Sequence, residues 1–115
     1  MVFVWAFILF FILVGRGTLL AQTPEEFLRQ SSQLVSQFQW SEATRLLDKA
    51  LDRYPDEPDL LLQLGSLLVR SGQASQGEPL LQRALEFRPE SLQILLQIAE
   101  ARLAQGQIHS AVALL

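Results

Sequence analysis

The sequence predicts an all-α fold, a right-handed α-solenoid of antiparallel helix pairs preceded by an apolar N-terminal helix. Two observations carry this prediction. Prolines, alanines, glycines and leucines recur with one common offset of 34 residues, and such self-similarity is the signature of a repeat architecture. Within each period, leucines are spaced by three and four residues, which is the spacing of a helix buried along one face.

The period holds for several residue types at once, which chance coincidences would not produce. Prolines recur where a helix has to end, because proline cannot continue a helix and restricts the residue before it. Small residues recur where two helices have to approach closely. The recurring sets are Pro55 and Pro89, Ala50 and Ala84, Gly72 and Gly106, and Leu47 with Leu81 and Leu115.

Helix-start signals fix where the repeats begin. Thr23, Pro24 and Glu26 form a capping box with proline at the first helical position. Ser91 is a plausible cap for the fifth helix, and Ser75 for the fourth, whose first turn Pro79 should distort. The predicted helices span residues 24–37, 41–54, 58–71, 75–88 and 92–105, with a stub beginning near 109.

A 34-residue unit of two helices resembles the tetratricopeptide repeat (TPR) family, whose pattern runs W-x2-L-G-x2-Y, then A-x3-F, then P. The resemblance covers residues 24–115, as units 24–57 and 58–91 and a truncated unit 92–115. The middle unit matches best, and its residues in the slots of the pattern are Leu61, Leu64, Gly65, Leu68, Gly77, Leu81, Ala84 and Pro89.

The chain departs from the family pattern at Gln30, Gly77 and Arg102. Small residues such as Gly65 remain where the first helix of a pair must let the second approach. We therefore expect Gly65 to face the crossing of the two central helices, with Leu64 and Leu81 buried beside it.

Residues 1–22 predict a signal peptide or a membrane anchor. Thirteen residues from Val2 to Val14 carry no polar side chain, a length that suits a secretory signal and falls short of the ~20 residues that span a bilayer. If the helix continued to Leu20 it would be long enough to span a membrane, but it would place the charged Arg16 side chain within the bilayer, which is energetically costly. A mispredicted start or a buried helix is a third alternative. We expect an exported protein, periplasmic or secreted, or one anchored through this segment.

Composition argues against several other classes of function. The net charge of −3 is unsuited to nucleic acid. There is no cysteine, and the single histidine, His109, falls in the predicted turn before the stub. The acidic residues Asp56, Glu57 and Asp59 lack the pattern of a calcium loop and are interpreted as charges that complement a helix start. We therefore expect no enzyme activity, no cofactor and no metal, and contact with a membrane only through the N-terminal segment.

The family resemblance implies a partner-binding surface on the concave face, which is lined by the first helix of each pair. Some members of the family bind a carboxylate on this face through Lys, Arg and Asn side chains. None of these residue types occupies the candidate positions of this chain. We expect a protein or peptide partner with an apolar or amphipathic segment, or self-association; alternatively the chain's own continuation covers this stripe. The candidate residues are Leu28, Ser32, Val35, Leu62, Ser66, Val69, Leu96, Glu100 and Leu103.

Three interpretations of function stay open at this point. The first is an exported or tethered scaffold for protein–protein interaction through an apolar concave groove. The second is an accessory region of a longer exported enzyme whose catalytic domain lies beyond residue 115, and the third is a membrane-anchored assembly subunit. Because the last unit stops in mid-helix, we expect the chain to continue or a partner to complete it.

Overall fold

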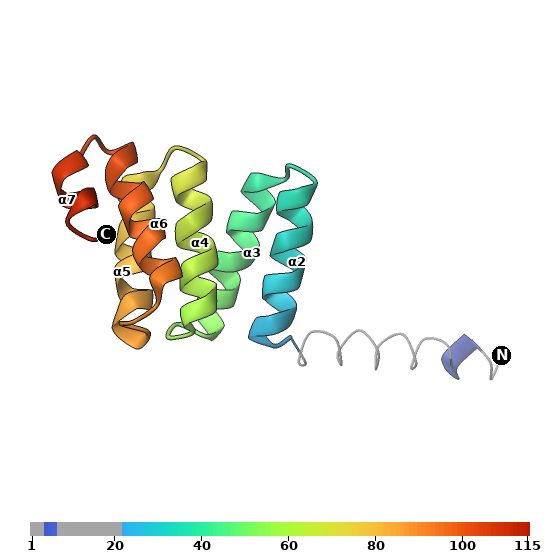
Figure 1. The fold of residues 1–115 in the computed structure, drawn as a ribbon. Coiled ribbons are helices and arrows are strands. Elements are labelled where there is room, and N and C mark those ends of the chain that lie inside the picture. Colours follow the sequence, from blue (N-terminus) through green and yellow to red (C-terminus); the bar gives the residue numbers. More distant parts are fainter. Residues whose placement is uncertain (1–3, 7–21) are drawn as a thin grey trace.

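A computed structural model describes residues 4–6 and 22–115, and its part from residue 22 onward is a row of α-helices (Figure 1). Every boundary lies within one residue of the predicted range, and the described residues contain no strand, which confirms the all-α prediction for this part of the chain. The helices are α2 (Pro24–Ser36), α3 (Trp40–Arg53), α4 (Pro58–Arg70), α5 (Ala74–Phe87), α6 (Leu92–Ala104) and α7 (Ile108–Val112).

The predicted N-terminal signal or anchor falls almost entirely outside the described residues, and so does the predicted apolar N-terminal helix. Within residues 4–6 and 22–115, no helix has the length and apolar character that crossing a bilayer requires.

The helices stand side by side, each packed against the next one in the chain (Figure 1). Helix α4 also contacts both α2 and α6, so these three helices form one continuous layer. Helices α3 and α5 are farther apart, since no Cα atom of one lies within 8 Å of a Cα atom of the other. The handedness of the stack stays a prediction.

Two of the three predicted helix caps are confirmed. The Thr23 hydroxyl oxygen accepts a hydrogen bond from the backbone N–H of Glu26 at 3.3 Å, and Ser91 does the same for Ile94 at 3.3 Å. The prediction for Ser75 was wrong, because α5 begins one residue earlier, at Ala74.

The distortion expected at Pro79 does not interrupt α5, which continues through this residue. Pro79 is the sixth residue of α5 and thus lies beyond the first turn. His109 likewise lies inside a helix, as the second residue of α7, and not in the turn before it.

The core consists of two clusters that meet on α4. One joins α2, α3 and α4 and includes Phe27, Leu47 and Leu64; the other joins α4, α5 and α6 and includes Leu81 and Ile98. Helix α4 contributes to both, which explains why it carries leucines around most of its circumference. Five leucines of α4 spaced by one, three or four residues, Leu60, Leu61, Leu64, Leu67 and Leu68, are all buried, as expected for Leu64.

The closest approach of two helices is the crossing of α4 and α5 at Gly65 and Gly77. A Cβ atom on Gly77 would lie 2.6 Å from the Gly65 carbonyl oxygen, and a Cβ atom on Gly65 would lie 2.7 Å from the Leu81 side chain. Gly65 therefore faces the crossing, as predicted. Gly77, a departure from the family pattern, lets the two backbones come into direct contact.

The two glycines should differ in their tolerance of a methyl group. Gly77→Ala should destabilise the fold by about 1–3 kcal/mol, because the added Cβ meets backbone that can move only if the helices separate. Gly65→Ala should cost less, because its nearest neighbour is a leucine side chain that can change rotamer. Urea denaturation of both variants measures the difference, and an equal or reversed order would show that the crossing is not limited by backbone contact.

Candidate functional site

The packing of α2, α4 and α6 against one another brings part of the predicted partner surface together. Val35, Leu62 and Ser66 line one small cavity of about 110 Å³ at the junction of these helices. The other six candidates lie outside the lining of this cavity. Leu96 and Leu103 are exposed, at 43% and 50%, and Ser32 and Glu100 are exposed too, whereas Leu28 and Val69 are half-buried.

Leu62 does not behave as an open surface residue. It is only 9% exposed and packs in the same cluster as Ile94 and Ile98 of α6. Val69 packs against that cluster as well. The physical reason is that α4 has neighbours on both sides, so that α6 covers positions that a helix at the end of the row leaves open. Leu62 is therefore a core residue.

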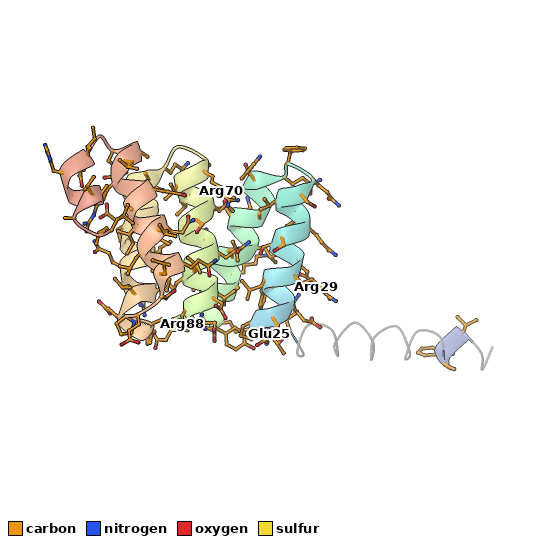
Figure 2. The ribbon with its side chains drawn as sticks, in the orientation of Figure 1. Glu25, Arg29, Arg70 and Arg88 are labelled. Atoms are coloured by element: carbon orange, nitrogen blue, oxygen red, sulfur yellow. The ribbon has the colours of Figure 1, made fainter. Side chains whose placement is uncertain are left out.

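The cavity at this junction is largely polar, which was not predicted. Leu67 and three glutamines, Gln63, Gln93 and Gln97, complete its lining together with Arg70. Figure 2 labels Arg70 near the end of α4. The side-chain oxygen of Gln97 is buried and has no hydrogen-bond partner within the described residues. Such a group is costly when unsatisfied.

A signal for these glutamines was present in the sequence. Gln63 and Gln97 lie one period apart and hold the same place on α4 and α6. Arg29 holds that place on α2, and Figure 2 shows its side chain extending from α2 away from α4. The predicted partner surface did not include this repeated polar position.

Arg102, a second departure from the family pattern, is a structural residue. Its guanidinium donates to the Glu78 carboxylate at 2.9 Å, and the Gln105 amide donates to the other oxygen of that carboxylate at 2.8 Å. Burial raises the pKa of Glu78, but the hydrogen bonds from Arg102 and Gln105 outweigh that effect and hold the pKa below its ordinary value. This network ties α6 to α5.

Two acidic residues at the start of α4, Asp56 in the preceding turn and Asp59 in the first turn, form ion pairs that were not predicted. Asp56 accepts from Arg83 at 2.6 Å, and Asp59 accepts from Arg88 at 2.6 and 3.2 Å. All four side chains are close to half-exposed or more, so each pair contributes little to stability. Among the described residues, no group of His, Cys, Asp or Glu side chains is arranged to hold a metal ion.

Phe38 is an exposed aromatic residue that was not among the predicted features. It follows the cap of α2 with a φ of 60°, where Gly72 and Gly106 have φ values of 84° and 77° in the corresponding turns. In each turn the next residue donates its N–H back into the helix, as Gln39 does to the Leu34 carbonyl at 2.8 Å. A left-handed conformation disfavours any side chain. Even so, Phe38 is 80% exposed and gains little packing in return.

Two substitutions of Phe38 should distinguish the backbone strain of this turn from the packing of the aromatic ring. Phe38→Gly should be more stable than Phe38→Ala by about 1 kcal/mol, since only glycine adopts a positive φ without steric cost. Thermal or urea unfolding of the two variants gives the difference directly. Equal stability would mean that the turn relaxes to another conformation when the ring is removed.

Comparison with known proteins agrees with this architecture. A family model described as a tetratricopeptide repeat matches residues 34–86, from the end of α2 almost to the end of α5. Among solved structures, the chain is similar to the globular C-terminal domain of P. aeruginosa LpoP, with 25% identity and a TM-score of 0.72 over 76% of this chain and 87% of that one. A search of curated proteins found no match. The chain thus contains a tetratricopeptide repeat and shares its fold with that domain.

Proposed function

We propose that this chain is a scaffold for protein–protein interaction, exported or tethered to a membrane, which holds an apolar or amphipathic segment of a partner on the face formed by α2, α4 and α6. The observation that carries the proposal is the continuous layer of these three helices. Residues one period apart lie beside one another in such a layer, so a partner segment can contact several units at once.

The open part of this face lies on α6. Leu96 and Leu103 are two helical turns apart and thus share one side of the helix, with Glu100 between them. Two exposed leucines flanking one carboxylate suit an amphipathic segment better than a purely charged one.

The polar cavity at the junction of α2, α4 and α6 would add directional contacts. A donor from a partner, such as a backbone N–H, would satisfy the buried Gln97 oxygen that has no partner within residues 22–115. This combination of leucines and amides supports recognition of a peptide segment. The proposal of export rests on the apolar run from Val2 to Val14, which lies largely outside the described residues.

The exposed residues Leu96 and Leu103 can be replaced without changing the core, so their substitution tests the proposal. A fluorescein-labelled amphipathic 16-residue peptide of leucine and glutamine serves as the probe, and fluorescence anisotropy measures its affinity. Leu96→Glu combined with Leu103→Glu should weaken binding by about tenfold or more, because each exposed leucine removed forfeits on the order of 1 kcal/mol of burial. Raising the salt concentration should change the wild-type affinity little, since no ion pair carries the contact.

The matched control places the same two charges elsewhere, as Phe87→Glu with Ile108→Glu, both also exposed. Circular dichroism should report unchanged helix content for both double variants. Leu62→Glu is unsuitable as a probe because it would put a charge into the core. Equal weakening by the control, or unaltered binding by the folded Leu96 and Leu103 variant, would move the site away from this face.

A further inference from the structure

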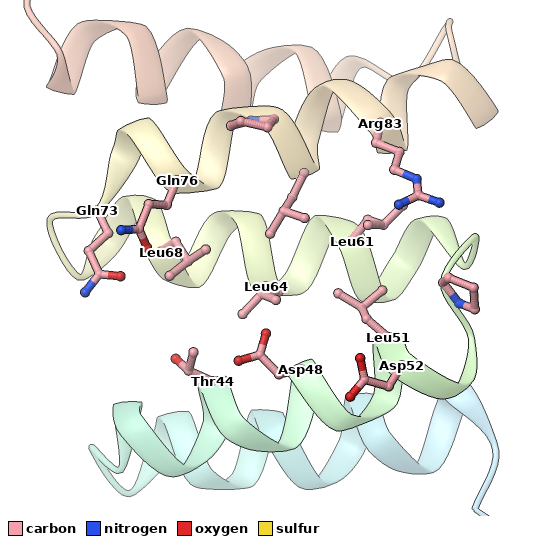
Figure 3. A pocket seen from close by; sticks show the side chains of 13 residues that line it. Thr44, Asp48, Leu51, Asp52, Leu61, Leu64, Leu68, Gln73, Gln76 and Arg83 are labelled. Atoms are coloured by element: carbon pink, nitrogen blue, oxygen red, sulfur yellow. The ribbon is translucent and has the colours of Figure 1, made fainter.

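A second and larger groove lies between α3 and α5. Its volume is about 640 Å³, and its floor consists of Leu61, Leu64 and Leu68 of α4 (Figure 3). The two half-buried leucines Leu51 and Leu80 line its walls. The remaining lining residues are Thr44, Asp48, Asp52, Pro55, Gln73, Gln76, Pro79 and Arg83.

The groove exists because α5 is held closely against α4 at Gly65 and Gly77 while α3 packs against α2 and the other side of α4. No Cα atoms of α3 and α5 come within 8 Å of each other. The lining residues of α3 run from Thr44 to Asp52, so this wall of the groove extends over about 12 Å, or a little more than two helical turns.

This groove is separate from the face formed by α2, α4 and α6. Successive residues of an α-helix are rotated by about 100°. On that basis Leu61, Leu64 and Leu68 point in a direction roughly opposite to Ser66 and Arg70, which line the small cavity described above. A ligand in the groove and a ligand on the other face would thus lie on opposite sides of α4.

The α3 wall of the groove is acidic and lacks a basic partner. Asp48 and Asp52 lie one helical turn apart and point toward the groove (Figure 3), and neither belongs to an ion pair among the described residues. Burial, and then the charge of Asp52, raises the pKa of Asp48. Like charges at this spacing repel each other.

The opposite wall supplies no free cation. Gln73, Gln76 and Pro79 of α5 are uncharged, and Arg83 is already paired with Asp56 at 2.6 Å. That ion pair connects α5 to the turn before α4 and lies at the Pro55 end of the groove. A cationic group from outside would therefore find two carboxylates that the fold leaves uncompensated.

We propose that the groove between α3 and α5 is a second partner-binding site, which takes a short apolar segment of a protein carrying a Lys or Arg side chain opposite Asp48 and Asp52. Because the floor leucines are themselves buried, Leu51, Leu80 and the two prolines of the lining provide the apolar contact, and the two carboxylates select for a cation. An anionic phosphate of a nucleic acid or a lipid would be repelled by the same two groups.

Two labelled 12-residue peptides with the same apolar pattern test this site by fluorescence anisotropy, one of leucine and lysine and one of leucine and glutamate. The lysine peptide should bind and the glutamate peptide should not. Asp48→Asn with Asp52→Asn should weaken binding of the lysine peptide by about tenfold, because both charge pairs with the peptide are lost. Glu86→Gln with Glu90→Gln changes the net charge equally outside the groove and should leave the affinity within about twofold.

A second variant tests the cavity independently of its charge. Gln76→Trp fills the groove from an exposed position of its wall and should abolish binding of the lysine peptide without unfolding the chain. Leu96→Glu with Leu103→Glu should leave that binding in place. Equal weakening by the Glu86 and Glu90 control would indicate nonspecific attraction and overturn the proposal. Unaltered binding by folded Gln76→Trp, or loss of binding by the Leu96 and Leu103 variant, would also overturn it.

Discussion

The contact between the backbones of α4 and α5 at Gly65 and Gly77 is the constraint on which the rest of the arrangement depends. With a Cβ on Gly77 only 2.6 Å from the Gly65 carbonyl oxygen, no larger residue fits without separating the helices. The close pairing places Leu81 over α4 and forms one half of the core, while the other side of α4 remains free to pack against α2 and α3. Helix α4 thereby becomes the shared element of both core clusters.

The same pairing accounts for the two surfaces. Because α4 stands between α2 and α6, these three helices form a continuous face with a polar cavity and exposed leucines. Because α5 is held close to α4 and out of reach of α3, an apolar groove with two uncompensated carboxylates opens on the opposite side. The partners proposed above differ accordingly, with a neutral amphipathic segment on one face and a cationic segment on the other. A scaffold built this way could hold two chemically different partners at once.

The helix boundaries and the central helix crossing were predictable from the sequence because they depend on local residue patterns. The period, the prolines and the capping residues gave every helix boundary to within one residue, and Gly65 was correctly placed at the crossing. The burial of Leu62 was not predictable from a stripe on one helix, because α6 covers it. The groove depends on the distance between α3 and α5, which no pattern within either helix encodes. Phe38 could have been found, since the period aligns it with Gly72 and Gly106.

Hydrogen exchange at single amides tests the central role of the α4–α5 pair most directly. If the crossing organises the fold, amides in the middle of α4 and α5 should be protected up to the free energy of global unfolding. Those of α7, which packs on α6 alone, and of α2, which stands at the end of the row in Figure 1, should exchange through local opening at lower free energy. Protection that is uniform across the helices, or highest in α2 and α3, would contradict this account.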